Sequence, residues 1–500
     1  MSDTNDTAKK PVELSEANLD AIESPVVVPG YDRATVTDRI VHFGVGGFFR
    51  SHQAMYLDAL KAQGLADGWA ITGVATLPHD RRIYDTMTAQ DGLYTLVVKH
   101  PDGHRDAQVI GSMTGVLFAP DDPQAVIDAL VDDATKIVGL TITEGGYCFH
   151  PVTGEFNPED ASIKADLEPG ATPTSAFGFI VAALAARRAA GKDPFTVQSS
   201  DNIPGNGDVA KKMVSAFAEV NNPELAEWIR AEVAFPNSMV DRITPVTTDE
   251  DRASLTEEFG VVDGWPVVCE PFTQWVIEDH FPQGRPAWEK VGAQMVEDVI
   301  PYELMKLRLL NASHQALAYL GYLSGYRYAH EVCSDPLFVT FLLGYMEQEG
   351  SPTLPEVPGM DLDQYRHQLI ERFANPSVRD HLARLCLESS DRIPKWLVPV
   401  INENLASGGE IDRSALVVAS WARYAEGVDE QGEPIEVQDR LKEQVMAAAA
   451  KQGDDPLAFL QQRDLFGDLV DDERFTTVYL KALSSLHDQG SRATLEEWGK

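Results

Sequence analysis

Residues 40–50 read IVHFGVGGFFR, a short apolar run that is followed at once by a turn rich in glycine. An amphipathic stretch, 48–63, comes after the turn, and a second apolar run occupies residues 69–75. A strand, a glycine turn, a helix and a second strand within roughly 30 residues are typical of a β-α-β unit. This stretch therefore predicts the start of an α/β domain with a parallel sheet.

The glycine turn is a candidate for binding a dinucleotide. Gly44, Gly46 and Gly47 would let the backbone approach a pyrophosphate, and the N-terminus of the following helix would attract its negative charge. Phe49 occupies the place of the third glycine in the usual G-x-G-x-x-G pattern. On this motif alone, an ordinary turn between a strand and a helix is an equally good interpretation.

An acidic residue beyond the second strand indicates which dinucleotide would bind. Asp80 is placed to accept hydrogen bonds from the ribose hydroxyls and to repel a 2′-phosphate, which favours NAD over NADP. Arg81 and Arg82 follow directly and could serve a 2′-phosphate instead. A third interpretation is that Asp80 caps a helix and that the two arginines are solvated.

The rest of the N-terminal half continues the alternation of strands and helices. We predict a mostly parallel sheet covered by helices, with an antiparallel insertion over 93–118. The expected strands are 93–98, 109–118, 136–143 and 195–200, and the expected helices are 123–132 and 175–190.

From residue 301 onward the apolar spacing is helical, so the second half is expected to be a mainly α-helical domain. The sequence thus predicts a mobile tail over 1–25, a Rossmann-like dinucleotide-binding domain with an expanded sheet over 26–297, and an α-helical substrate and catalytic domain over 298–500. The expected C-terminal helices are 304–322, 337–345, 362–373, 415–424 and 475–486, and 427–436 is expected to be a solvated surface turn.

Composition excludes several classes of function. The net charge of -37 disfavours binding to nucleic acid or to an anionic membrane surface. The sequence shows neither a secretory signal nor an apolar run of about 20 residues, so we expect a cytoplasmic protein without a membrane span. The 4 cysteines form no C-x-x-C pair and no cluster of zinc ligands, which predicts neither a disulfide framework nor a metal site.

Four polar residues in one helical stretch carry the strongest chemical signal. At about 100° per residue, Glu303, Asn311 and His314 lie at roughly 60°, 140° and 80° from Lys306, within one face of an otherwise apolar helix. A lysine removed from water titrates closer to neutrality and could accept the proton of a substrate hydroxyl while hydride leaves the carbon. Asn311 could donate a hydrogen bond to the developing alkoxide.

The same stretch has two other interpretations. Single lysine, asparagine or histidine residues in a helix are usually structural. Tyr302 and Lys306 also form a Y-x-x-x-K pair, which short-chain dehydrogenases use for catalysis. In that family the pair lies in the domain of the glycine turn, whereas here it opens the helical domain, so we assign Tyr302 a structural role.

The motif K-x5-N-x2-H formed by Lys306, Asn311 and His314 resembles the signature of the polyol-specific long-chain dehydrogenases. The glycine turn at 40–53 and the motifs at 143–147, 200–204 and 235–245 resemble the same family, in the same order. The similarity runs from about residue 30 to the C-terminus. Within the family it is greatest to the members that oxidise D-mannitol at C2 to D-fructose.

The resemblance implies roles for individual residues. Lys306 would be the general base, Asn202 and Asn311 would form the oxyanion site, and Glu303 would gate proton exchange. The substrate hydroxyls would be held by His314, Asp241 and Arg384. Glu144 would line the same substrate-binding pocket, and Asp80 would hydrogen-bond to the adenosine ribose. Family members need no zinc and act as monomers on a polyol or ketose, so we expect the same here.

Related reactions remain as alternatives. D-arabinitol 4-dehydrogenases and fructuronate or tagaturonate reductases share the catalytic helix, and a sugar acid would require an extra basic residue such as Arg392 or Lys395. Arg392 also stands where the family often has lysine, and His79 stands where a second acid can precede Asp80 in strict NAD users. The resemblance therefore leaves the substrate and the preference for NAD over NADP open.

Overall fold

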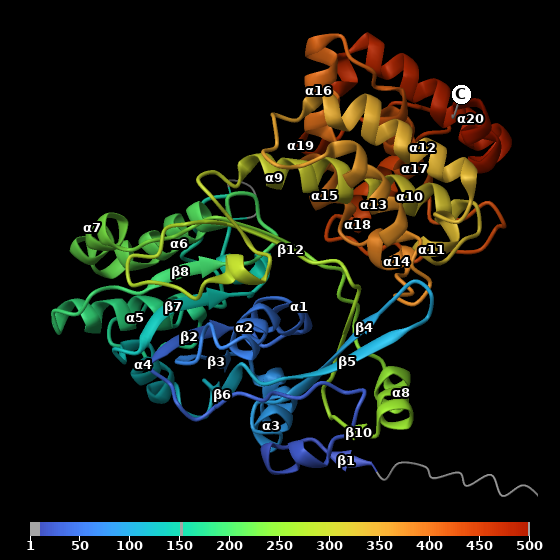
Figure 1. The fold of residues 1–500 in the computed structure, drawn as a ribbon. Helices are drawn as coiled ribbons and strands as arrows, with labels where there is room; N and C mark the ends of the chain where they lie inside the picture. Colours follow the sequence, from blue (N-terminus) through green and yellow to red (C-terminus); the bar gives the residue numbers. More distant parts are fainter. Residues whose placement is uncertain (1–10, 151–153, 499–500) are drawn as a thin grey trace, which may run out of the picture. The chain divides into compact units, whose positions relative to one another are not determined.

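A computed structural model describes residues 11–150 and 154–498 of the chain. It divides into two compact units, one running to Val299 without residues 101–103 and the other comprising Ile300 onward together with Pro101–Gly103. The first unit contains every strand of the described residues, and the second is built from helices and loops (Figure 1).

The centre of the first unit is a five-stranded sheet in the order β6-β3-β2-β7-β8, in which all neighbours are parallel. The chain leaves β2 toward β3 on one side and returns to its other side at β7. Ligands of open α/β sheets bind at the carboxyl ends of the strands at such a switch point. The strands are β2 (Asp38–Phe43), β3 (Trp69–Ala75), β6 (Met113–Phe118), β7 (Thr135–Leu140) and β8 (Thr196–Ser199).

Two hydrophobic cores cover the two faces of this sheet because side chains alternate along each strand. In β2, Val41 and Phe43 belong to one core and Ile40 to the other. The first core is closed by α4 (Pro123–Val131), α5 (Ala176–Ala189), α6 (Asn206–Asn221) and α7 (Pro223–Glu232), and the second by α1 (Gly47–Ser51), α2 (Gln53–Ala62) and α3 (Arg81–Ala89).

Three smaller sheets extend this unit. They have the orders β11-β4-β5, β13-β12-β9 and β1-β10. Their strands are β4 (Tyr94–Lys99), β5 (Arg105–Ile110), β11 (Val267–Cys269), β9 (Ser238–Asp241), β12 (Gln274–Glu278), β13 (Gln294–Val296), β1 (Val12–Glu13) and β10 (Val261–Val262); α8 spans Asp249–Phe259.

The prediction of one strand over 109–118 was wrong. The chain forms β5 and then β6, and the break lies at Gly111 and Ser112. Side chains, not a neighbouring strand, form hydrogen bonds with the backbone there. The Gly111 amide donates to Asp58 Oδ1 at 2.7 Å, and its carbonyl accepts from Arg33 Nε at 2.9 Å. The antiparallel insertion is therefore limited to β4 and β5, while β6 joins the main sheet beside β3.

Two further predictions in this unit need correction. The helix expected over 48–63 is split at His52, whose backbone leaves the helical region (φ -123°, ψ -92°) and whose Nε2 is 2.9 Å from the Gln274 carbonyl. The tail expected over 1–25 is ordered from residue 11, since β1 pairs with β10 and Leu14 is buried. Residues 1–10 of that expected tail lie outside the described residues.

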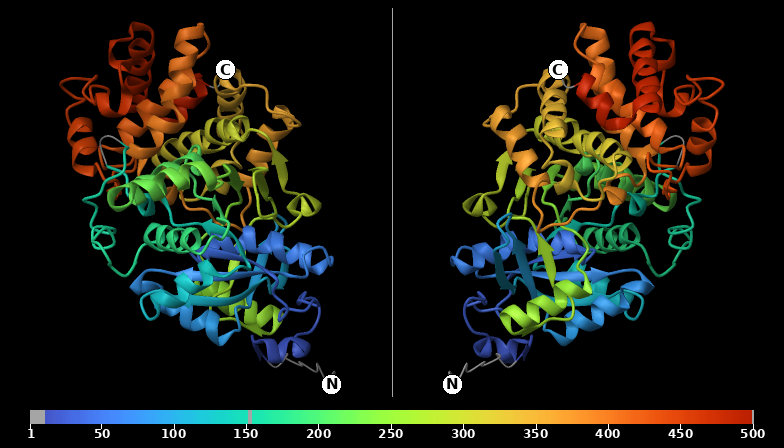
Figure 2. Two further views of the ribbon diagram at one scale, coloured as in Figure 1. Left: turned by 90° about the vertical axis from the view of Figure 1, so that its left-hand side faces the viewer. Right: turned by 90° about the vertical axis from the view of Figure 1, so that its right-hand side faces the viewer.

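The second unit confirms the predicted helical character, and two further views show its helices from other sides (Figure 2). The turn expected at 427–436 is less solvated than predicted, because Asp429 and Ile435 are buried. Its helices are α9 (Ile300–Met305), α10 (Ala312–Leu323), α11 (Ala329–Val332), α12 (Pro336–Tyr345), α13 (Leu362–Phe373), α14 (Leu382–Leu385), α15 (Ser389–Trp396), α16 (Val398–Ser407), α17 (Asp412–Tyr424), α18 (Lys442–Ala449), α19 (Arg463–Phe466) and α20 (Glu473–Trp498).

Candidate functional site

The glycine turn follows β2 at the carboxyl edge of the main sheet. Gly44 has φ +89°, and a Cβ there would lie 2.1 Å from the Thr141 carbonyl oxygen, so only glycine fits. A Cβ on Gly46 would meet nothing within 4 Å, and one on Gly47 would only touch Thr244 Cγ2 at 3.6 Å. The turn thus has the open backbone face that a pyrophosphate needs, and its residues fit a dinucleotide.

Phe49, in the place of the third glycine, has a packing role. Its ring stacks on His42 of β2, with centroids 3.8 Å apart and planes inclined by 15°. Burial lowers the pKa of His42 to about 3, so the ring is neutral. A Cβ on Gly139 would lie 2.1 Å from His42 Nδ1, so the neighbouring strand also needs glycine. Close contact between the helix and the sheet is achieved here by an aromatic stack.

Asp80 lies beyond β3, at the position where the sequence predicts a carboxylate that accepts hydrogen bonds from the ribose hydroxyls. Its Oδ2 accepts a hydrogen bond from the Leu77 amide at 3.1 Å. Neighbouring groups engage both arginines. Arg81 pairs with Asp85 at 3.0 Å and with Asp121 at 2.6 Å, and the Arg82 guanidinium carbon lies 4.8 Å from the centroid of the Trp265 ring. These internal contacts compete with any role of the arginines at a 2′-phosphate.

Asp201 organises the ends of β7 and β8, and sequence reasoning missed it although it precedes the predicted Asn202. Its carboxylate accepts from the amides of Ile142 and Thr143 at 3.2 and 2.7 Å and from the Tyr147 hydroxyl at 2.8 Å. Burial raises the pKa of Asp201 despite these hydrogen bonds. The carboxylate thereby fixes the turn that presents Glu144 next to the segment that presents Asn202; both side chains are exposed.

The predicted Asp241 ends β9 and is buried. The next residue, Arg242, donates to the Glu270 carbonyl at 3.1 Å and to the Ser51 carbonyl at 2.6 Å. These hydrogen bonds tie the strand that carries Asp241 to the helix after the glycine turn. The Ser51 and Thr244 hydroxyls, 2.8 Å apart, add a second tie between the same segments.

Asn206 and Asn237 support the segment around Asn202. Asn206 Nδ2 donates to the carbonyls of Asp201 and Ser238 at 3.0 and 2.7 Å. Asn237 Oδ1 accepts from the Gly207 amide at 2.8 Å in the first turn of α6. Sequence reasoning included Asn237 in a family motif but gave it no role.

In the second unit, the helix that carries Lys306 is not a regular α-helix. Between α9 and α10, the residues Lys306–Asn311 form a π-helix, η5, in which the Ala312 amide donates to the Leu307 carbonyl five residues earlier. The angles predicted from 100° per residue are therefore wrong between Lys306 and Asn311. Bonds from residue i to residue i+5 bring positions five apart onto the same face, and π segments are frequent at functional sites.

The predicted polar residues of this helix are partly buried, except for Asn311, which is buried with 5% exposure. Asn311 Nδ2 is buried and has no hydrogen-bond partner among the described residues. His314 packs against Phe373, with ring centroids 4.4 Å apart. Glu303 lies in α9, close in sequence to Lys306. Tyr302 has the structural role we assigned, because its buried hydroxyl donates to the Pro358 carbonyl at 2.7 Å.

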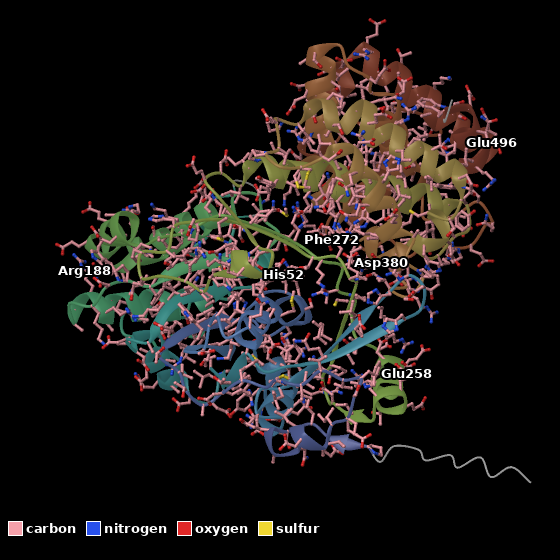
Figure 3. All side chains as sticks on the ribbon, viewed as in Figure 1. His52, Arg188, Glu258, Phe272, Asp380 and Glu496 are labelled. Carbon is pink, nitrogen blue, oxygen red and sulfur yellow. The ribbon has the colours of Figure 1, made fainter. Side chains whose placement is uncertain are left out.

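Arg384 lies in α14 and is held by Asp380, which is labelled in Figure 3 and which sequence reasoning missed. The segment is joined to the Lys306 helix, because Gln315 Nε2 donates to the Leu385 carbonyl at 3.1 Å. Of the two basic residues considered for a sugar acid, Arg392 donates to the same carbonyl at 3.0 Å and Lys395 pairs with Asp391 at 2.8 Å.

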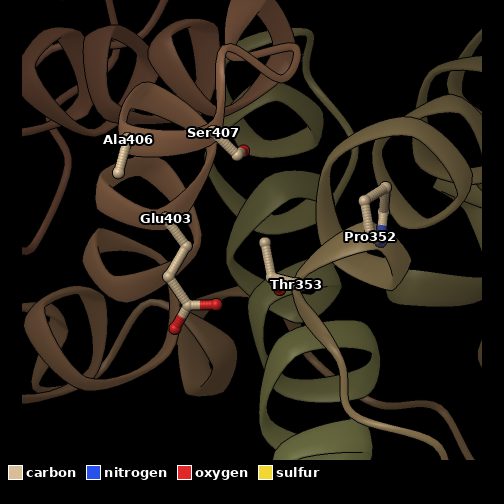
Figure 4. A pocket seen from close by; sticks show the side chains of 5 residues that line it. All are labelled: Pro352, Thr353, Glu403, Ala406 and Ser407. Atoms are coloured by element: carbon tan, nitrogen blue, oxygen red, sulfur yellow. The ribbon is translucent and has the colours of Figure 1, made fainter.

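Three further findings concern other kinds of site. Among residues 11–150 and 154–498, no group of three or more His, Cys, Asp and Glu side chains could hold a metal ion. No helix of the described chain is long and apolar enough to cross a bilayer. A cavity of about 380 Å³ in the second unit is lined by Pro352, Thr353, Glu403, Ala406 and Ser407 (Figure 4).

Comparisons with known proteins agree with this arrangement. The family model of the mannitol dehydrogenase Rossmann domain matches residues 38–290, and that of the mannitol dehydrogenase C-terminal domain matches residues 298–487. A mannitol 2-dehydrogenase of Aspergillus fumigatus is 46% identical over 98% of this chain and 99% of its own.

Two solved structures extend the likeness to the fold. One is a Pseudomonas fluorescens mannitol 2-dehydrogenase in a ternary complex with NAD and D-mannitol. It is 45% identical, with a TM-score of 0.88 over 97% of this chain and 99% of its own. The other is a D-sorbitol dehydrogenase, 35% identical, with a TM-score of 0.87 over 96% of this chain and 100% of its own. With both domains matched and the similarity extending over nearly the whole chain, the protein belongs to the mannitol dehydrogenase family.

Proposed function

We propose that this protein oxidises the C2 secondary alcohol of D-mannitol to the ketone of D-fructose, reversibly and with NAD. Relatives named for this reaction cover almost the whole chain, and one of them was solved with NAD and D-mannitol. In the balanced reaction, hydride leaves C2 for NAD and the hydroxyl proton leaves for a base, giving fructose, NADH and a proton.

Lys306 is the base in this proposal and accepts the hydroxyl proton. The side chain is half-buried, so it is partly removed from bulk water while a substrate can still reach it. Glu303, in the preceding α9, passes the proton on to solvent. Bound NAD would supply the hydride acceptor, and the protein's own groups manage the proton and the oxygen.

The observation that carries the proposal is the buried amide of Asn311. A buried N–H group without a partner costs about 1–3 kcal/mol, which a ligand oxygen would relieve. Asn311 Nδ2 is such a group, and the π-helix places Asn311 on the same face as Lys306. A hydrogen-bond donor on the same helix face as the base can stabilise the alkoxide that develops during oxidation.

The remaining roles rest on the family motifs. Asn202 is the second donor to the reacting oxygen. Asp241, Glu144, Arg384 and His314 hold the other hydroxyl groups of the polyol. The anchoring of Arg384 by Asp380 and the burial of Asp241 support fixed positions for both side chains.

For the cofactor, Gly44, Gly46 and Gly47 would face the pyrophosphate, Phe49 would support the turn, and Asp80 would read the ribose. The pairing of Arg81 with two carboxylates favours NAD over NADP. We further propose that the protein acts as a monomer in the cytoplasm, as the family resemblance implies; light scattering of the purified chain would test the monomer.

Among the alternative substrates, sugar acids are disfavoured because Arg392 and Lys395 are engaged within the second unit. D-arabinitol remains the main alternative substrate. It has a shorter chain of hydroxyl groups, which the same polar side chains could hold.

The test is NADH absorbance with purified protein and a panel of mannitol, sorbitol, arabinitol, fructose and fructuronate, with and without a chelator. Mannitol turnover should be insensitive to the chelator. It should fall by at least about 10³-fold in Lys306→Ala, because the proton then has no positioned acceptor. The exposed Lys442→Ala is the matched control and should behave as wild type. Turnover of fructuronate but not fructose would replace the proposed substrate by a sugar acid.

A further inference from the structure

The π-helix η5 leaves one backbone carbonyl without its usual partner. In a continuous α-helix the Ala312 amide would bond to the Arg308 carbonyl, four residues earlier. In η5 that amide donates to Leu307 instead. The Tyr345 hydroxyl, at the end of α12, donates to the Arg308 carbonyl at 2.9 Å. A side chain from another helix therefore satisfies the carbonyl that the π register frees.

The Arg308 side chain holds the same turn from its other end. Its guanidinium donates to both carboxylate oxygens of Glu403 at 2.8 and 2.7 Å and to the Thr353 carbonyl at 2.6 Å. The Arg308 side chain is 9% exposed and that of Glu403 is 49% exposed, so a buried guanidinium reaches a carboxylate at the surface. Glu403 also lines the cavity of Figure 4, on α16.

Close packing of a second π segment completes the support. The residues Met346–Gly350 form η6, directly after Tyr345. A Cβ on Gly350 would lie 2.8 Å from Leu309 Cδ2 and 3.3 Å from the Arg308 carbonyl oxygen. The two π segments thus pack closely at this glycine, which keeps Tyr345 next to the freed carbonyl.

We infer that Tyr345 is a positioning residue for the reaction: with the Arg308–Glu403 pair, it stabilises the π register that turns Lys306 and Asn311 to one face. Without the π register the two side chains would lie about 140° apart, at the two edges of the polar face, so the base and the oxyanion donor would converge less closely on one hydroxyl group. This inference rests on the proposed function for its catalytic consequence, whereas its structural part concerns the second unit alone.

The experiment compares Tyr345→Phe with Tyr479→Phe. Both tyrosines are fully buried in the second unit, and the Tyr479 hydroxyl donates to Gln452 Oε1 at 3.2 Å, away from η5. Hydrogen exchange of the peptide 306–316 and the kinetics of mannitol oxidation are measured for each variant. In Tyr345→Phe we expect faster exchange in this peptide and a kcat lower by about tenfold, with KM for mannitol changed by less than about twofold. Tyr479→Phe should resemble wild type in both respects.

Glu403→Gln weakens the same turn through its pair with Arg308 and should change hydrogen exchange and kcat in the same direction. This variant replaces Tyr345→Phe in the test if Tyr345→Phe fails to fold. Unchanged protection of the peptide overturns the inference whatever kcat does, and so does faster exchange with an unchanged kcat. A wild-type protein that does not oxidise mannitol would instead contradict the proposed function. The exchange measurement would then decide alone whether Tyr345 holds the π turn.

Discussion

The carboxylate of Asp380 accepts two hydrogen bonds from the guanidinium of Arg384, one from Nε at 2.7 Å and one from Nη2 at 2.6 Å. Asp380 is 7% exposed and Arg384 is 46% exposed, so a buried acid holds an arginine that remains open to solvent. A fork of two parallel bonds fixes the plane of the guanidinium as well as its position. The directions of the remaining N–H groups, on Nη1 and Nη2, are thereby fixed as well.

Asp380→Asn should therefore weaken substrate binding more than catalysis. The amide keeps the size of the side chain but loses the charge-assisted pair, which is worth about 1.5–3 kcal/mol. We expect KM for mannitol to rise by about tenfold, with kcat within about threefold of wild type. Steady-state kinetics at saturating NAD would measure this. Asp391→Asn, which breaks the solvent-exposed pair with Lys395, serves as the control; an equal KM in the two variants would refute a role for the orientation of Arg384.

The glycine turn allows a test of cofactor placement that needs no substrate. Gly46 has φ -67°, and a Cβ there would have open space, so Gly46→Ala should fold with a stability close to that of wild type. The added methyl group would, however, occupy room that the pyrophosphate needs, and we expect Kd for NADH to rise by at least about tenfold. Titration by NADH fluorescence would measure it.

Gly44→Ala is the matched contrast in the same turn. Its Cβ would lie 2.1 Å from the Thr141 carbonyl oxygen, at φ +89°, so this variant should lose at least about 2 kcal/mol of folding free energy. If Gly46→Ala bound NADH as tightly as wild type, the cofactor would not approach this backbone.

The sequence predicted most of the first unit because its signals are local. The apolar run at β3 and the glycine turn after β2 define the β-α-β unit through periodicity and backbone freedom. The break between β5 and β6 was not predictable in this way. It depends on Arg33 and Asp58, which are distant in sequence and take the backbone groups of Gly111.

The same distinction applies to the candidate site. Lys306, Asn311 and His314 could be found because their spacing in one helix is a sequence pattern. The π register could not, since it is supported by Tyr345 and Glu403 from other helices. Asp201 and Asp380 were missed for a similar reason: each acts by holding a neighbour, and nothing in the residue type distinguishes such an acid from a solvated one.

The preference for NAD can be tested at Asp80. Asp80→Ser removes the carboxylate that would repel a 2′-phosphate, and we expect the ratio of kcat/KM for NADP to that for NAD to rise by about tenfold or more. Adding Asp121→Asn releases Arg81 from its 2.6 Å partner and should raise the ratio further. Each protein is measured with both cofactors, so a general loss of activity cancels in the ratio. An unchanged ratio in both variants would mean that Asp80 does not face the adenosine ribose.

His42 predicts a pH dependence of stability in the first unit. Burial lowers its pKa from 6.5 to about 3, so between these values the unfolded chain binds a proton that the folded chain does not. The free energy of unfolding therefore rises with pH across this window, and the contribution is lost as the pH falls from 6.5 toward 3. Between pH 7 and pH 5 the loss from this one residue should be about 2 kcal/mol.

His42→Gln isolates this contribution, because glutamine does not titrate and its amide could still reach Thr141 Oγ1, which lies 3.0 Å from His42 Nε2. The urea unfolding of wild type and variant would be compared at pH 7 and pH 5, so that the other titrating groups contribute equally to both proteins. Wild type should lose about 2 kcal/mol more than the variant on this change of pH. Equal losses would contradict this prediction, because they would mean that His42 binds a proton in the folded protein. The charged ring would then have to fit between Phe49 and the Gly139 backbone.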